Sequence, residues 1–194
     1  MSHHDIDLVA PAPVGIDPDT PLLLQPLARA LLRVNQAMVT LGMLALLVAS
    51  VVLTSSVVSR YAMQASTDWQ DEAAVFCLVG ATFLCGAFVQ SLRGHVGIEA
   101  VAGLLPISLN QWRVMLVDLL SVLFCAFFAW KSWTLFHEAW VDKQTTSSSW
   151  APPLWIPYAL MAAGMTLLSL QLLVQLSARL NALTKKNDNK ERVA

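Results

Sequence analysis

The sequence has little charge. Only 13% of its 194 residues are Asp, Glu, Lys or Arg, about half the ~25% of an average soluble domain. Hydrophobic residues make up 56% of the chain, and they come in long blocks, which indicates an integral membrane protein. The net charge of −1 gives no indication of a nucleic-acid partner.

Side chains that carry chemistry are also scarce. Three cysteines lie in apolar runs without CxxC or CxxH spacing, which argues against a disulfide framework and against a zinc site: Cys77, Cys85 and Cys125. None of the four histidines falls at the middle of an apolar run, where a haem-binding bundle would need them. No nucleophile and base are spaced as in an enzyme. The chain is therefore expected to have no cofactor and no catalytic site.

Four long runs with little or no charge predict four transmembrane helices. The expected spans are 34–58, 73–90, 114–136 and 154–177. Each reaches or approaches the ~20 residues that cross a bilayer, and a backbone inside lipid must bond to itself, which favours helices. The predicted fold is an all-α integral membrane protein with a four-span domain at 34–178 and a short interfacial helix between spans 2 and 3.

The flanking segments differ in composition. Residues 1–21 are rich in Asp and Pro and are predicted to form a disordered tail. Residues 22–33 are rich in Leu and contain Arg29 and Arg33, which favours an amphipathic helix on the membrane surface. Residues 179–194 form a basic tail.

The basic residues predict the orientation. With both ends on one side, nine Lys and Arg share that side: Arg29, Arg33, Arg93, Arg113, Arg179, Lys185, Lys186, Lys190 and Arg192. Arg60 and Lys143 are on the other side. Because positive loops stay in the cytoplasm, both termini are expected there. Most of the tryptophans gather near the opposite interface, as aromatic belts do.

The connection between spans 2 and 3 contains three ionisable groups beside a short apolar stretch. A helix over 95–105 would be roughly 16 Å long at ~1.5 Å per residue, too short to cross. His95 and Glu99 would share one side of it, and Arg93 would lie at headgroup depth. The pair could face water or a partner, or all three groups could be solvated loop residues. Periodicity alone favours the second interpretation.

Polar residues inside the spans indicate helix contacts. Asp118 lies about one turn inside span 3 and is expected to meet a polar group on a neighbouring helix or on a partner chain. Lys131 is expected near the outer end of that span, where its long stem can reach the interface. Gln171 and Gln175 share a stripe with Gly164, which is expected to face protein.

Small residues of span 2 predict close helix packing. Cys77, Ala81 and Cys85 recur every four residues, and Gly80 belongs to a second stripe. Such stripes let two helix backbones approach. Packing is the preferred interpretation for all three cysteines.

Several segments together resemble a known family. They are 69–76 (WQDEAAVF), 93–96 (RGHV) with Glu99, the LP at 105–106 and 149–158 (SWAPPLWIPY). In order and spacing they are similar to the small membrane subunit of TRAP (tripartite ATP-independent periplasmic) transporters. The resemblance covers about residues 34 to 175, and the family has four spans with both ends in the cytoplasm.

The resemblance implies a role beside two partners. A large multi-spanning permease subunit would carry the substrate and sodium sites, and a periplasmic binding protein would deliver the substrate, usually an organic acid. The location implied is the bacterial inner membrane. Candidate assembly residues are Arg93, His95, Glu99, Asp118, Gln171 and Gln175. Candidate docking residues for the binding protein are Trp69, Asp71, Glu72, Asp142 and Trp150.

The alternative is a stand-alone four-helix membrane protein, either a transporter or channel or a tetraspan scaffold. Small multidrug exporters depend on an acid within the first span. This chain has no charge between Arg33 and Arg60, which disfavours that class. The low internal polarity favours a subunit instead.

Overall fold

Four long helices make up nearly all of the structure, a computed structural model that describes residues 20–63, 67–92 and 107–193. A short 3₁₀ helix, η1 (Leu22–Leu24), leads into α1 (Gln25–Met63). It is followed by α2 (Asp68–Ser91), α4 (Ile107–Val141) and α5 (Trp155–Val193). Each long helix is apolar and long enough to cross a membrane. The prediction of an all-helical chain with four such helices is confirmed.

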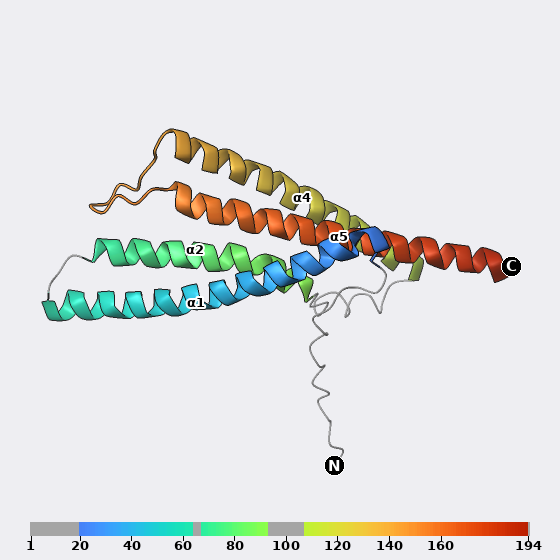
Figure 1. The fold of residues 1–194 in the computed structure, drawn as a ribbon, viewed down its shortest axis with the longest axis horizontal. Helices are drawn as coiled ribbons and strands as arrows, with labels where there is room; N and C mark the ends of the chain where they lie inside the picture. Colours follow the sequence, from blue (N-terminus) through green and yellow to red (C-terminus); the bar gives the residue numbers. More distant parts are fainter. Residues whose placement is uncertain (1–19, 64–66, 93–106, 194) are drawn as a thin grey trace, which may run out of the picture.

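The helices form a row of two hairpins. α1 lies antiparallel to α2, and α4 lies antiparallel to α5 (Figure 1). The hairpins meet where α2 packs against α5, so the order across the row is α1, α2, α5, α4. Near its start α1 also touches α5, where Ala28 and Leu31 are buried with Val174. α5 is accordingly the most buried span and α1, at one edge, the least.

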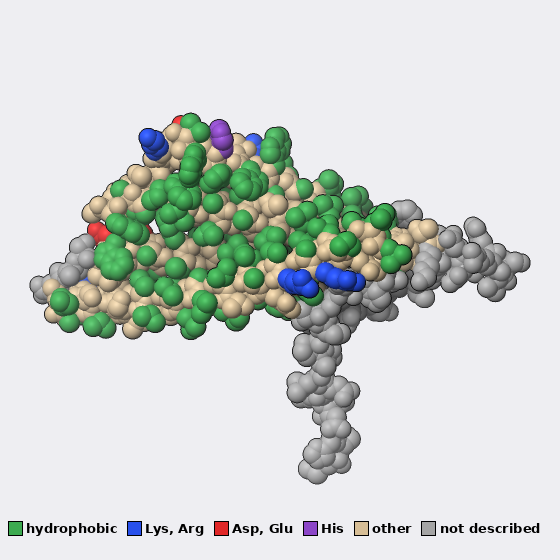
Figure 2. All heavy atoms as spheres, viewed as in Figure 1, with side chains coloured by type: hydrophobic (Ala, Val, Ile, Leu, Met, Phe, Trp, Pro, Cys, Tyr) green, Lys and Arg blue, Asp and Glu red, His purple; other side chains and the backbone are tan. Residues whose placement is uncertain are grey.

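Small side chains fill the contacts between helices, and large ones face outward. The buried alanines are Ala28 and Ala49 of α1, Ala74, Ala81 and Ala87 of α2, Ala129 and Ala139 of α4, and Ala162 and Ala178 of α5. Without a hydrophobic driving force in lipid, such residues stabilise helix pairs by close packing. Hydrophobic side chains are spread over the whole described part of the face seen in Figure 2, and charged ones are few. Apolar surface on this scale is typical of contact with lipid or a partner chain.

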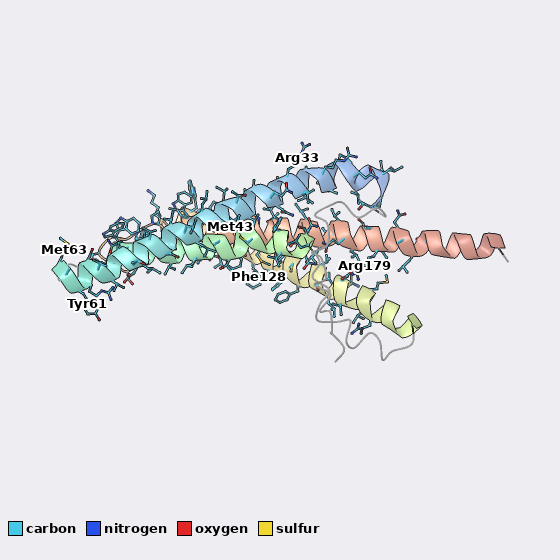
Figure 3. The ribbon with its side chains drawn as sticks, turned by 90° about the horizontal axis from the view of Figure 1, so that it is seen from below. Arg33, Met43, Tyr61, Met63, Phe128 and Arg179 are labelled. Atoms are coloured by element: carbon cyan, nitrogen blue, oxygen red, sulfur yellow. The ribbon has the colours of Figure 1, made fainter. Side chains whose placement is uncertain are left out.

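The two ends of the row differ. The loop end consists of the end of α1, the start of α2 and the loop 142–154, and Tyr61 and Met63 lie there (Figure 3). The terminal end consists of the starts of α1 and α4 and of α5 from Arg179 onward. At the terminal end α1 and α4 diverge on opposite sides of α5 (Figure 3).

Several helix ends differ from the predicted spans. α1 runs unbroken from Gln25 to Met63, roughly 58 Å at ~1.5 Å per residue. Residues 25–33 are therefore the first turns of α1 rather than a separate helix. α4 and α5 extend beyond 114–136 and 154–177, and α5 continues through the expected tail to Val193. Charged residues indicate where a chain leaves the membrane, but they do not end a helix. The positions of charges therefore do not predict the helix ends.

Two predicted elements lie outside the described residues. They are most of the 1–21 tail and the interfacial helix expected over 95–105, with its Arg93, His95 and Glu99. Both stay predictions.

Candidate functional site

A polar cluster joins α1 to α2 at the loop end. Ser56, which is fully buried, donates a hydrogen bond to Asp71 Oδ1 at 3.0 Å. Arg60 Nη2 donates to Asp71 Oδ2 at 3.0 Å and to Thr67 Oγ1 at 2.8 Å. The Asp71 carboxylate thus bonds to two residues of α1. Although exposed ion pairs contribute little on their own, the added hydroxyl bonds hold the end of α1 against the start of α2.

The loop 142–154 folds back on itself. Thr145 and Pro153 form an antiparallel bridge, and the Leu154 amide donates to the Gln144 carbonyl at 2.9 Å. Lys143 and Ala151 have positive φ angles of 51° and 47°, a conformation that L-residues seldom adopt. Strained residues persist where their surroundings over-determine them, so this loop has a defined shape.

Two tryptophans connect that loop to α2. The rings of Trp69 and Trp150 meet edge to face, with centroids 6.4 Å apart. Ser149 Oγ donates to Asp68 Oδ2 at 3.4 Å. Both tryptophans remain about half exposed. The loop end therefore presents a fixed, partly aromatic surface assembled from both hairpins.

The structure brings some predicted docking residues together and leaves others apart. Trp69 and Trp150 are in contact, and Asp71 lies in the cluster with Arg60. Asp142 is exposed at the start of the loop, where Gln144 Nε2 lies 3.5 Å from its Oδ2. The predicted span 2 starts at residue 73, directly after Glu72, whereas α2 begins at Asp68, which places Glu72 in the second turn. The earlier start is favoured because acids near a helix N-terminus interact well with its dipole.

Aromatic rings also gather where α4 meets α5 at the loop end. Trp140 contacts Trp155 with centroids 5.0 Å apart, and Phe136 lies between Trp133 and Trp140. Tryptophan prefers the headgroup level of a bilayer. The Trp140–Trp155 contact is therefore expected at the membrane interface of the loop end.

Two pairs of amides hold α5 against α1 and α2 toward the terminal end. Asn35 Nδ2 donates to Gln171 Oε1 at 3.1 Å. Gln90 Nε2 donates to Gln175 Oε1 at 2.9 Å, and Gln175 Nε2 donates to the Gln90 carbonyl at 3.0 Å. Asn35 is completely buried. The amides of Gln171 and Gln175 thus bond within the chain, and a role for them at a partner surface stays a prediction.

An ion pair joins α4 to α5. Asp118 Oδ2 lies 2.8 Å from Arg179 Nη1, and the two side chains are 20% and 25% exposed. The two atoms are shielded from solvent, but they are not aligned for a hydrogen bond. The contact is therefore mainly electrostatic. The polar group on a neighbouring helix that meets Asp118 is therefore Arg179 of α5.

The small residues of α2 lie at two helix contacts. A side chain placed at Gly42 of α1 would run into Cys85 and approach Ala81. A side chain at Gly80 would come within 3.1 Å of Leu160 of α5. α2 therefore presents one small-residue face to α1 and another to α5. Cys77 is partly buried and its thiol is free.

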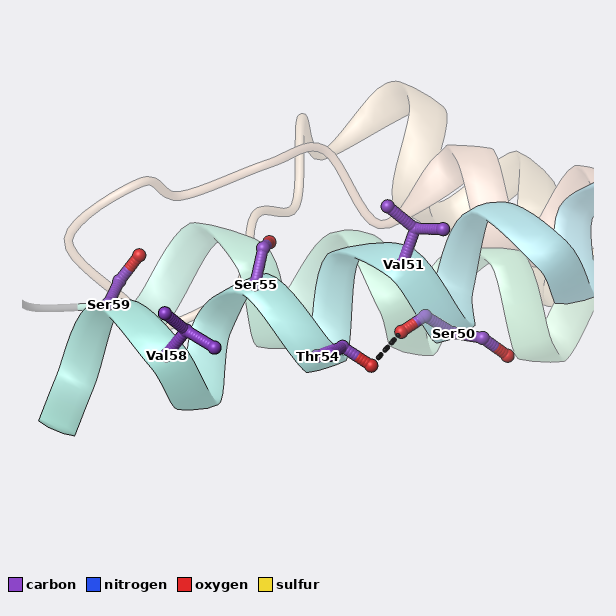
Figure 4. A pocket seen from close by; sticks show the side chains of 6 residues that line it. All are labelled: Ser50, Val51, Thr54, Ser55, Val58 and Ser59. Atoms are coloured by element: carbon purple, nitrogen blue, oxygen red, sulfur yellow. Dashed lines mark hydrogen bonds between the residues drawn. The ribbon is translucent and has the colours of Figure 1, made fainter. Parts of the chain in front are cut away.

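A shallow groove on α1 is lined by hydroxyl and valine side chains (Figure 4). Its lining residues are Ser50, Val51, Thr54, Ser55, Val58 and Ser59. Thr54 Oγ1 donates to the Ser50 carbonyl at 2.7 Å, and Ser50 Oγ donates to the Leu46 carbonyl at 2.9 Å. Because these hydroxyls bond to their own helix, the groove suits apolar contacts better than a polar substrate. In the described part of the chain, no three His, Cys, Asp or Glu side chains are grouped to hold a metal ion.

A comparison of the sequence with known protein families identifies the family of this chain. The family model named DctQ, for the DctQ component of tripartite ATP-independent periplasmic transporters, matches residues 49–182. The match covers well over half of the chain. The chain belongs to the DctQ family. No curated protein and no solved structure matches it significantly.

As a DctQ component, the chain is a transporter subunit and not an enzyme. The matched region begins midway along α1 and ends in α5. It therefore includes the loop end and the Asp118–Arg179 pair. TRAP transporters in general also have DctM and DctP components, so a DctQ protein works in a complex.

Sequence reasoning missed several residues that the DctQ fold uses. Asn35 and Gln90 pair with the two predicted glutamines, and Ser56 bonds to Asp71. An amide in an apolar run is a usable signal, because burying it without a partner is costly. Ser56 gives no such signal, since serines inside helices commonly bond to their own backbone.

Proposed function

We propose that this DctQ protein scaffolds the large membrane subunit of a TRAP transporter and helps to dock its periplasmic binding protein. The transport would be uptake of an organic acid driven by an ion gradient, and sodium is the ion we propose. The loop end would face the periplasm, and both termini would face the cytoplasm of a bacterium with an inner membrane. The nine-to-two distribution of Lys and Arg supports this orientation.

The observation that carries the proposal is the construction of the loop end. The Arg60–Asp71 cluster ties α1 to α2, and the Trp69–Trp150 contact ties α2 to the α4–α5 loop. A surface fixed by contacts between both hairpins loses little conformational entropy when it binds, which favours docking. Half-exposed tryptophans are also frequent at the centres of protein interfaces.

A pull-down tests the scaffold role. The full chain, tagged at its C-terminus, is purified from its native membranes in mild detergent, and the bound proteins are identified by mass spectrometry. We expect a large multi-spanning protein at about equal amount. A chain that emerges alone would contradict the proposal, and transport by this chain alone in liposomes would favour a stand-alone transporter.

A substitution tests the docking role. Trp69→Ala should lower the stimulation of uptake by the binding protein while the membrane complex keeps its composition. Trp69→Phe should retain more of the stimulation, because it keeps an aromatic ring against Trp150. Leu23→Ala, at an exposed residue of the terminal end, is the control and should change nothing. Full stimulation with Trp69→Ala would contradict this role.

A further inference from the structure

Three contacts fix the antiparallel register of α4 and α5. Trp140 meets Trp155 at the loop end. Further along, Trp133 Nε1 donates to Thr166 Oγ1 at 3.1 Å. At the terminal end Asp118 pairs with Arg179 at 2.8 Å. Each residue of α4 between these contacts can therefore be assigned a level along α5.

With Trp155 and Arg179 taken as the levels of the two membrane interfaces, this register places Lys131 well inside the membrane. Lys131 is close to Trp133 and so lies near the level of Thr166. At ~1.5 Å per residue, Thr166 is about 17 Å along α5 from Trp155 and about 20 Å from Arg179. Because the hydrocarbon core is ~30 Å thick, Lys131 lies near its middle.

At this level Lys131 lies deeper than the expectation of a position near the outer end of its span. Lys131 is about 14 Å along the helix from Trp140, farther than its stem can reach. Cα–Cβ bonds in a helix also tilt toward the N-terminus. On α4 that direction leads to the terminal end, the more distant of the two interfaces. The ammonium group therefore stays at depth.

Lys131 belongs to a face of α4 that no described helix covers. The residues of α4 buried at or toward α5 include Ala129, Ser132 and Ala139. Lys131 is exposed and points to another side of the helix. We define the Lys131 face as Leu120, Phe124, Phe127, Lys131 and Leu135, whose four apolar members are all exposed.

The charge on this face is not neutralised within the described part of the chain. Lys131 Nζ lies 5.6 Å from the centroid of the Trp130 ring, a cation–π contact that offsets part of the cost of leaving water. None of the ion pairs among the described residues includes Lys131. A charged side chain at the bilayer centre is costly when it faces lipid and marks a functional contact by default.

We propose that the Lys131 face binds a transmembrane helix of the large membrane subunit, and that this helix carries a carboxylate opposite Lys131. The inference rests on the proposed function, since it requires that partner. An acidic side chain of the partner complements the Lys131 cation, and the neighbouring phenylalanines supply apolar packing around the pair. Lipid tails complement the phenylalanines but not the charge.

The test compares complexes purified through the full-length tagged chain. Lys131→Met and Lys131→Glu should each lower the amount of large subunit retained per tagged chain by tenfold or more. Neither the insertion nor the amount of the tagged chain should fall with Lys131→Met, because methionine makes α4 more apolar. Lys143→Met is the matched control, since it removes a lysine from the loop 142–154, and it should retain the partner fully.

The possible outcomes separate this inference from the proposed function. If the unaltered chain retains no multi-spanning protein, the proposed function fails. If the unaltered chain and Lys131→Met retain the large subunit equally, only the present inference is overturned, and Lys131 faces lipid. A photo-crosslinker at Leu135 provides a second measurement. It should join the large subunit near an Asp or Glu, and changing that acid to Lys should restore assembly of Lys131→Glu.

Discussion

Asp118 of α4 and Arg179 of α5 form an ion pair with 2.8 Å between Oδ2 and Nη1. It lies toward the terminal end, where α4 turns away from the rest of the row (Figure 3). The side chains are 20% and 25% exposed, so water screens the pair only in part. The contact therefore holds the α4–α5 hairpin together close to where its helices diverge.

Removing either charge of this pair should destabilise the protein. Asp118→Asn or Arg179→Gln is expected to lower the free energy of unfolding by about 1–2 kcal/mol, less than the ~3–5 kcal/mol for a fully buried pair. The double variant should lose less free energy of unfolding than the two single variants lose together. Thermal unfolding in detergent measures this, at about 2–4 °C per kcal/mol for a chain of this size.

Arg60→Gln provides the comparison for that experiment. The side chains of the Arg60–Asp71 pair are 58% and 49% exposed, and such pairs contribute at most ~1 kcal/mol. A larger loss for Arg60→Gln than for Arg179→Gln would contradict the ranking by burial. Additive effects of Asp118→Asn and Arg179→Gln would show that the pair is not coupled.

Gly164 sets the distance between α5 and α2. A Cβ at this position would overlap the backbone of Phe83, which cannot move aside as a side-chain tip can. Gly164→Ala should therefore force the hairpins apart and lower the free energy of unfolding by about 1–3 kcal/mol. The thermal midpoint should fall by several degrees.

Gly86→Ala is the matched control in the same bundle. Nothing lies within 4 Å of a Cβ added there, and alanine is favoured over glycine inside a helix by ~0.5–1 kcal/mol. We expect Gly86→Ala to keep or raise the thermal midpoint. Equal losses in the two variants would mean that close approach at Gly164 is not what limits the packing.

Ala151→Gly should stabilise the loop 142–154. Its φ of 47° costs an L-residue ~1–2 kcal/mol in the left-handed region, while glycine adopts it freely. Because glycine also loses more entropy on folding, the expected gain is at most ~1 kcal/mol. Slower cleavage of this loop by protease and a higher thermal midpoint would show the stabilisation. Ala151→Val should lower the thermal midpoint. A valine variant that is more stable than the original chain would contradict the claim that the backbone is strained at this position.

The four membrane helices could be predicted because their signal is local. Each is a long run with little or no charge, and lipid permits only a helix for such a run. The helix ends could not be predicted in the same way, because α1 and α5 continue past Arg33 and Arg179 without a residue that stops them. The stripe of Gln171 and Gln175 was foreseen from spacing alone, but their partners Asn35 and Gln90 were not.

The sequence by itself determined that this is a four-helix membrane protein and that it resembles the small subunit of TRAP transporters, because both follow from local composition and the order of short motifs. Only the tertiary structure decided how the helices are arranged in a row, which amides meet, and that Asp118 pairs with Arg179. It also decided the depth of Lys131, which depends on the register between α4 and α5. Register is set by side chains far apart in the chain that meet only after folding, so spacing within one helix does not reveal it.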